Sequence, residues 1–137
     1  MSYGAAAALQ TAIYQHLLAD SGVAAQVGTA VYDAVPAGQL PATYITLGPE
    51  DVRDRSDKSG AGSEHRFTIS VITRTGGYRD AKLAAGAVSD ALDGADITLS
   101  RGRLVGLWFT RALALRTGRA GGLRQIDLRF RARVEDN

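Results

Sequence analysis

The hydrophobic period of the chain changes from that of a strand to that of a helix between residues 65 and 92, and this change constrains the fold most. Alternation with polar residues predicts a strand whose buried face carries Phe67, Ile69 and Val71. Gly76-Gly77 ends that strand, because paired glycines adopt backbone angles that strand residues disfavour. Helical spacing follows at Ala81, Ala84, Ala85, Val88 and Leu92. The predicted unit is therefore a strand, a glycine turn and a helix that packs closely on the sheet.

The segments before this unit predict one helix and two extended pieces. Helical spacing over residues 5–18 predicts a helix whose apolar stripe packs on the sheet, formed by Leu9, Ile13 and Leu17. Residues 23–27 add one short helical turn. A short extended piece is predicted at residues 31–33 and a strand at residues 43–48, which Gly48-Pro49 ends because proline has no N–H to donate.

The segments after this unit predict a short strand at residues 97–99 and then a long antiparallel hairpin. Its first strand covers residues 104–117 and loses its alternation at residues 110–112, which indicates either a β-bulge or a change of exposed face. A glycine-rich turn at residues 118–122 leads to a regularly alternating strand over residues 123–135. Trp108 is out of phase with its apolar neighbours, so we expect both faces of the first strand to be covered, one by a neighbouring subunit. The core expected to face the helices comprises Phe67, Ile69, Val71, Leu107, Phe109, Leu128 and Phe130.

These elements predict an α+β fold, with an antiparallel or mixed sheet of four to five strands and two main helices packed on one face. The 137 residues are expected to form a single domain over residues 1–137, because that length is sufficient for one core. No apolar run approaches the ~20 residues that cross a bilayer, and no basic signal region precedes the first helix, so a cytoplasmic protein is expected. The absence of cysteine excludes disulfides and thiolate sites.

Residues 50–63 combine alternating charges with one large apolar residue, Val52. Such a segment buries too little apolar surface to offset the entropy of ordering it, so it is predicted to be the least structured part of the chain. Loops of this length inside a compact domain are functional or disordered. We therefore expect this segment to become ordered against a neighbouring subunit or another protein of an assembly.

The residues of catalytic and metal sites do not occur in the required patterns. His16 and His65 stand apart, with no second histidine at ligand spacing. Asp51, Asp54 and Asp57 recur at every third position, but they lie among cations and lack the spacing of a calcium loop. The sequence therefore predicts no enzyme, no metal and no cofactor.

Arginine supplies 14 of the 16 basic residues, and this bias has two interpretations. GC-rich coding DNA explains abundant Arg with scarce Lys, and a net charge of +2 is weak for a nucleic-acid-binding protein. The alternative function is a small basic nucleic-acid-binding module. Its contacts would come from Arg124, Arg129, Arg131 and Arg133.

The last strand carries a row of polar residues on the face opposite the core, because side chains alternate along a strand. The row comprises Gln125, Asp127, Arg129, Arg131 and Arg133. It is either a solvated outer face or a surface at a seam between subunits or on the inner wall of an assembly. In the second case its arginines pair with acidic residues of a neighbour, such as Glu50, Asp51 or Asp54.

The order and spacing of several segments resemble the DUF3168 family. These are Tyr32-Asp33 followed by Pro36, the strand from Tyr44 through Gly48, and the turn from Arg74 to Gly77. The resemblance covers residues 9–135. That family comprises tail completion or tail terminator proteins of long-tailed phages and of phage-like gene transfer agents. The resemblance implies a structural protein without catalysis and without a cofactor.

The resemblance also implies partners and a location. The family's proteins form a ring, usually a hexamer, that caps the tail tube and joins it to the connector under the capsid. The implied partners are other copies of the chain, the tail tube protein and the head-side stopper or connector protein, with DNA only as passing cargo and no membrane. The implied location is the bacterial cytoplasm during assembly and then the neck of the particle. The residues expected at partner interfaces are Glu50, Asp51, Arg53, Asp54, Arg55, Asp57, Lys58, Trp108, Arg129, Arg131 and Arg133.

Overall fold

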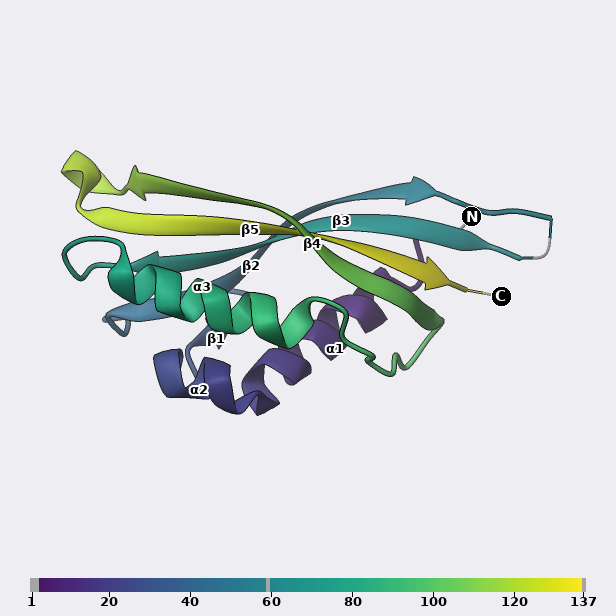
Figure 1. Cartoon of the computed structure of the whole chain (residues 1–137), viewed down its shortest axis with the longest axis horizontal. Coiled ribbons are helices and arrows are strands. Elements are labelled where there is room, and N and C mark those ends of the chain that lie inside the picture. The colour runs from purple at the N-terminus through teal and green to yellow at the C-terminus, as the bar shows by residue number, and fades with distance from the viewer. Residues whose placement is uncertain (1–2, 59, 137) are drawn as a thin grey trace.

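The protein combines a five-stranded mixed sheet with three α-helices, which confirms the predicted α+β class (Figure 1). The structure is a computed structural model and describes residues 3–58 and 60–136. The helices are α1 (Ala6–Ala19), α2 (Ser21–Val27) and α3 (Arg79–Leu92). The strands are β1 (Val31–Tyr32), β2 (Thr43–Asp54), β3 (Gly62–Thr73), β4 (Arg103–Thr117) and β5 (Leu123–Glu135), and a 3-10 turn, η1 (Arg119–Gly121), joins the last two.

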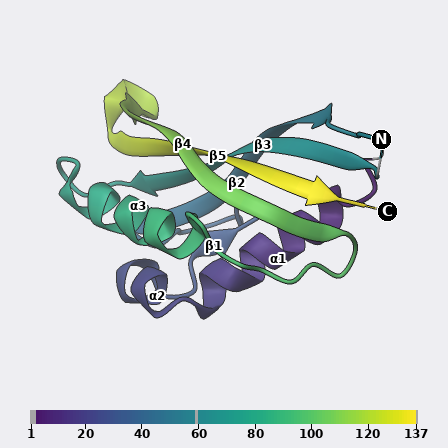
Figure 2. The same ribbon diagram turned by 45° about the vertical axis from the view of Figure 1, so that its right-hand side comes forward.

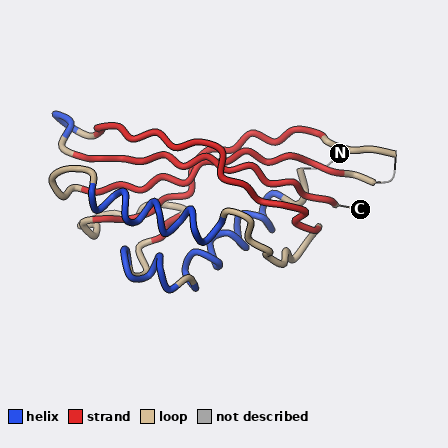
Figure 3. Tube along the Cα trace, viewed as in Figure 1, coloured by secondary structure: helices blue, strands red, loops and turns tan. Residues whose placement is uncertain are grey.

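The sheet has the strand order β1-β2-β3-β5-β4. β1 runs parallel to β2, and every other neighbouring pair is antiparallel. The long strands twist strongly about one another, so that β4 lies above β5 at the left end of Figure 1 and below it at the right end (Figures 1 and 3). The helices lie together on one face of the sheet, as Figure 2 shows from a second direction. Within residues 3–58 and 60–136, no α-helix lies on the other face.

The predicted strand, glycine turn and helix form β3, the turn and α3, and this unit is the centre of the core. The alanines of α3 that face the sheet are almost fully buried, which allows close approach of helix and strands. α1 presents the predicted stripe, and Leu9, Ile13 and Leu17 are at most 3% exposed. His16 Nε2 lies 2.9 Å from the carbonyl oxygen of Ala91, so this histidine links α1 to α3.

The prediction that residues 50–63 form the least structured segment is wrong for its two ends, because residues 50–54 belong to β2 and residues 62–63 to β3. β2 does not end at Gly48-Pro49: the register shifts between Leu47 and Glu50 as in a bulge, and the strand continues to Asp54. β3 begins at Gly62, so only residues 55–61 connect the two strands. The physical reason is backbone pairing. β3 is already held by β5 on its other side, and its free edge supplies hydrogen-bond partners whatever the side chains of β2 are.

Two further predictions about the second half of the chain are wrong. Residues 97–99 form no strand but a loop, in which Leu99 is buried against the core. Phe109 was expected in the core, yet it is 38% exposed. Register shifts beside Leu104 and again beside Phe109 change the phase of β4, which confirms the predicted bulge at residues 110–112. The other six predicted core residues are buried: Phe67, Ile69, Val71, Leu107, Leu128 and Phe130.

Candidate partner interface

The face of the sheet without helices is lined by charged residues, and we call it the open face. On β5 the buried residues alternate with the predicted polar row, so the row does lie opposite the core. The register places β3 and β4 residues beside it on the same face: Glu64 beside Arg133, Arg66 and Trp108 beside Arg131, and Arg111 beside Arg129. From β2, Asp51 lies opposite Arg66 and Arg53 opposite Glu64. The open face therefore has more cations than anions.

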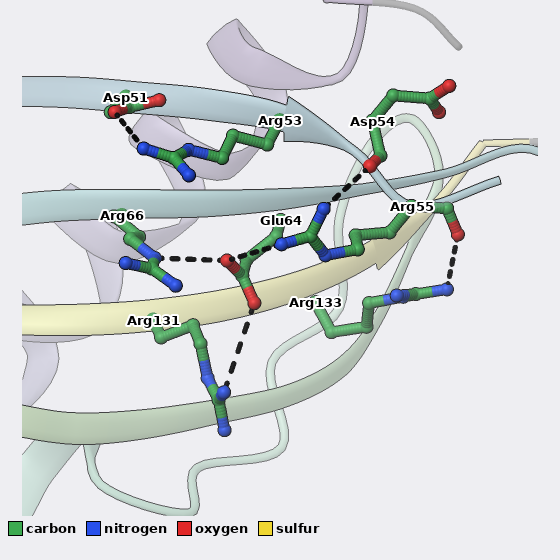
Figure 4. Close-up of polar contacts among 8 residues, drawn as sticks. All are labelled: Asp51, Arg53, Asp54, Arg55, Glu64, Arg66, Arg131 and Arg133. Atoms are coloured by element: carbon green, nitrogen blue, oxygen red, sulfur yellow. Dashed lines mark hydrogen bonds and ion pairs between the residues drawn. The ribbon is translucent and has the colours of Figure 1, made fainter.

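Glu64 is the centre of the ionic contacts on this face, as Figure 4 shows. Its side chain is 10% exposed. Arg66 Nε donates to its Oε2 at 3.0 Å, Arg55 Nη2 lies 3.7 Å from the same oxygen, and Arg131 Nη1 lies 3.9 Å from Oε1. No sequence pattern singled out Glu64, which stands between the charged segment of residues 50–63 and the strand predicted from residue 65. Its neighbourhood becomes visible only when β2, β3 and β5 are paired.

The end of the β2–β3 hairpin is attached to β5 through backbone oxygens. Arg133 Nη2 donates to the carbonyl oxygen of Arg55 at 2.6 Å, and Arg55 Nη1 donates to the carbonyl oxygen of Asp54 at 3.0 Å (Figure 4). The carboxylate of Asp54 accepts hydrogen bonds from the hydroxyl and the N–H of Ser56, which lowers the pKa of Asp54. Arg55, Asp54 and Arg133 are thus engaged within the chain.

The other hairpin residues that were predicted at an interface are exposed: Asp51, Arg53, Asp57 and Lys58. Asp51 and Arg53 form an ion pair of 3.5 Å, and both side chains are more than half exposed. At the tip, the N–H of Gly60 donates to Asp57 Oδ1 at 3.0 Å. Lys58 is exposed. Contacts of this kind contribute little to stability, so these side chains stay accessible to a partner.

Glu50 does not join the open face. It points to the opposite side of the sheet, where its carboxylate accepts a hydrogen bond from the Tyr3 hydroxyl. His65 is fully buried beside it, with Nδ1 3.7 Å from Glu50 Oε2 and Nε2 2.9 Å from the hydroxyl oxygen of Ser63. Burial lowers the pKa of His65, and Glu50 only partly offsets this effect.

Trp108 and two arginines complete the open face. The guanidinium of Arg131 lies 4.8 Å from the centre of the Trp108 ring, and Trp108 remains 39% exposed. Arg111 and Arg129 face each other across β4 and β5, and neither forms an ion pair with any carboxylate in the described part of the chain. These three side chains are therefore available for contacts outside the chain.

A shallow hollow of about 420 Å³ crosses the open face. All four long strands line it, from Pro49 on β2 to Thr110 on β4. The bulges of β2 and β4 both lie at this level, on either side of the Thr68–Arg129 pair. The hollow therefore lies where the two bulges interrupt the regular pairing of the strands.

Neither metal ligands nor a membrane span is present in residues 3–58 and 60–136. No three His, Asp or Glu residues in these ranges lie where they would hold a metal ion. No helix in them has the length and apolar character that crossing a bilayer requires. His16 and His65 are instead used within the fold.

The protein is thus a small α+β protein with helices on one face of a strongly twisted sheet. Its other face is charged and uncovered, which suits it to association with other protein subunits. The sequence profile of the family described as tail completion protein gp17 matches residues 11–135, so the chain belongs to that family. This confirms the resemblance found in the sequence. No curated protein sequence matches the chain.

A solved structure described as the virion of a native gene transfer agent particle contains a similar chain. The two chains are 65% identical, with a TM-score of 0.92, and the match covers 98% of this chain and 99% of that one. Family and structure together place the protein among the structural components of phage tails and phage-like particles. A structural role, and not catalysis, is what both comparisons indicate.

Proposed function

We propose that the protein is a tail terminator that forms a ring, closes the finished tail tube and joins it to the head-side connector. The observation that carries this proposal is the 65% identity to a chain of a gene transfer agent virion over nearly the whole length of both chains. Family membership supports the same role. In this role the protein assembles in the bacterial cytoplasm and then resides in the neck of the particle.

The geometry supports a ring because each subunit offers different surfaces on different sides. A closed ring is built from heterologous contacts, so one subunit needs two unlike surfaces that fit each other. The charged open face, the exposed Trp108 and the free strand edges supply such surfaces. The tip of the β2–β3 hairpin, with Asp57 and Lys58, extends beyond the helices at one end of the sheet (Figure 1). That end suits contact with a second protein, the tail tube or the connector.

The nucleic-acid-binding alternative has less support. Arg131 is held by Glu64 and Trp108, and Arg133 by the backbone of Arg55. Arg124 lies over the ring of Tyr78, 5.5 Å from its centre. Of the four arginines that this alternative needs, Arg129 alone is without such a contact among the described residues. DNA in this role is passing cargo, since tight binding to phosphates would hinder its movement through the ring.

The ring is tested by analytical ultracentrifugation of the purified protein over a range of concentration and salt. The subunit mass is 14.4 kDa, so a hexamer corresponds to about 86 kDa. A closed ring gives one discrete species that does not grow with concentration. A protein that stays monomeric under every condition contradicts the proposal.

The role in the particle is tested by removing the gene from a host that produces the particles. Electron microscopy should then show filled heads and separate tails, and supply of the wild-type protein should restore joined particles. Complete particles in the absence of the protein contradict the proposed function, whatever its oligomeric state.

A further inference from the structure

The two edges of the sheet are each covered over one half and free over the other. β1 pairs with β2 only at Ile45 and Thr46, so residues 50–54 of β2 have no strand on that side in the described chain. At the other edge, the N–H of Gly94 donates to the carbonyl oxygen of Leu107 at 2.7 Å, and Asp93 Oδ1 accepts from the N–H of Phe109 at 2.9 Å. These contacts cover β4 at residues 107–109, and no segment of the described chain pairs with the outer edge of residues 110–117.

The free half of β4 is apolar and exposed. Its centre is Ala112-Leu113-Ala114-Leu115, and Leu113 is 45% exposed. β4 as a whole carries four of the seven large hydrophobic residues that are exposed in the described chain. An apolar edge strand of this kind pairs with another chain unless something covers it. Arg111 and Arg116 flank the apolar run.

The strand directions indicate that a second copy of the chain covers this edge. β2, β3, β5 and β4 alternate in direction, so β4 is antiparallel to β2 of its own chain. A second copy, placed alongside with its strands pointing the same way, therefore brings its β2 antiparallel to β4 of the first. The same step repeats from copy to copy, as a heterologous contact must in a ring.

The charges of the two free halves are complementary. Residues 50–54 of β2 contain three carboxylates and one arginine, whereas residues 110–117 of β4 contain two arginines and no acid. Pairing two β4 edges with each other would instead gather four arginines at one seam. Like charges on facing strands are destabilising, so this arrangement is the less favourable one.

The positions of the free halves define how far one copy of the chain is shifted along the strand direction relative to the next copy. Val52, at the centre of one half, lies opposite His65, and Ala114, at the centre of the other, lies at the level of Val71. His65 and Val71 are six residues apart, which is about 20 Å along a strand. Four strand spacings from β2 to the β2 of the next copy span about 19 Å. The shift of about 20 Å along the strands and the step of about 19 Å across them are nearly equal, so the strands would be tilted by about 45° from the ring axis. This tilt is at the upper end of the range found in closed barrels.

We infer that the subunits of the ring are joined by pairing of residues 110–117 of β4 with residues 50–54 of β2 in the next copy, which makes one continuous antiparallel sheet. This inference rests on the proposed ring. The open face, with Arg111 and Arg129, then lies on the opposite side of this continuous sheet from the helices.

Cysteine cross-linking tests this seam directly, since the natural chain has no cysteine. Val52 and Ala114 lie on the helix side of the sheet in their own chains. Adjacent antiparallel strands bring such side chains within disulfide distance. The variants combine Val52→Cys with Ala112→Cys, Ala114→Cys or Arg116→Cys, which sample the register in steps of two. The matched control combines Val52→Cys with Leu113→Cys, whose side chain lies on the opposite face.

Mild oxidation of at least one of the three pairs should give a denaturing-gel ladder up to the full ring number, which reduction returns to the monomer. The control pair should stay monomeric. A ring by ultracentrifugation with no ladder from any pair overturns the seam but leaves the proposed function intact. A dimer from Ala114→Cys alone overturns it in favour of pairing between two β4 edges. The absence of any ring overturns the proposed function as well.

Discussion

Replacement of Phe130 by alanine tests the packing at the centre of the sheet. Phe130 is 1% exposed, stacks on Phe67 at 5.6 Å between ring centres, and meets the edge of Phe109 at 5.9 Å. Removing a buried aromatic side chain loses its transfer free energy and leaves a cavity that the twisted sheet can only partly close. We therefore expect Phe130→Ala to lower the free energy of unfolding by about 3–5 kcal/mol.

Phe109→Ala is the matched control. The two rings touch and have the same size, but Phe109 is 38% exposed and its removal leaves a groove open to water, not a cavity. The expected loss is about 1–2 kcal/mol. Phe130→Leu, which keeps most of the volume, should also lose only about 1.5 kcal/mol.

The measurement is urea unfolding followed by far-ultraviolet circular dichroism at one fixed protein concentration, because association adds to the apparent stability. A domain of this size has a total stability of about 7–20 kcal/mol, so the Phe130→Ala protein should still fold. Its melting temperature should fall by about 10–15 °C, against about 6 °C or less for Phe109→Ala. Equal losses for the two variants would contradict the reasoning that burial on the inner strand β5, as against the edge strand β4, decides the cost.

Three further predictions concern charges and the hairpin tip. Glu64→Gln should lower the free energy of unfolding by about 1–2 kcal/mol, because three half-exposed arginines lose the anion that they share. Arg66→Gln, the control, should lower it by less than about 1 kcal/mol in the same assay. If Glu64→Gln causes no loss, the central role of Glu64 is contradicted. Burial holds the pKa of His65 below its ordinary value of 6.5, so the unfolded state binds more protons than the folded state. The free energy of unfolding should therefore fall as the pH drops from about 6.5 towards the lower pKa of the folded state. His65→Gln should remove that part of the fall, and an unchanged pH profile would refute the role of His65 in it. Replacing residues 56–61 by Asn-Gly should leave the free energy of unfolding within about 1 kcal/mol of the wild-type value, while it should block the attachment of heads to tails. Normal particles made with this variant would exclude a role for the hairpin tip.

The last of these changes is confined to residues 56–61, because a larger deletion would shorten β2 and β3. A loop extending over residues 53–62 would have been the natural target if the charged segment were unstructured. The pairing of β2 with β3 up to Asp54 and Gly62 shows that such a deletion removes ladder hydrogen bonds. Loss of function in that larger deletion would therefore not distinguish a missing partner contact from a weakened sheet.

Local periodicity in the sequence was sufficient to identify most elements. The strand, glycine turn and helix from residue 65 to residue 92, the stripe of α1 and the alternation of β5 all appear in the structure as predicted. The arginine row opposite the core followed from the same alternation. Such patterns are readable because burial on one face imposes a period of two on a strand and of 3.6 on a helix. Family resemblance then supplied the role that no single motif carried.

The features that only the tertiary structure decided all depend on which strands lie side by side. Residues 50–54 form a strand because β3 offers a free edge, a fact that no property of their own side chains records. Phe109 faces the same side of the sheet as Phe130 but is exposed, because β4 is the edge strand and has a neighbouring strand on one side only. Glu64 meets Arg131 because β3 lies between β2 and β5. The half-covered edges arise from β1 and from the residues after α3, which pack on the strand that follows each of them in the chain. Backbone hydrogen bonding is indifferent to side-chain identity, so pairing partners, register shifts and free edges are fixed only when the whole sheet is assembled.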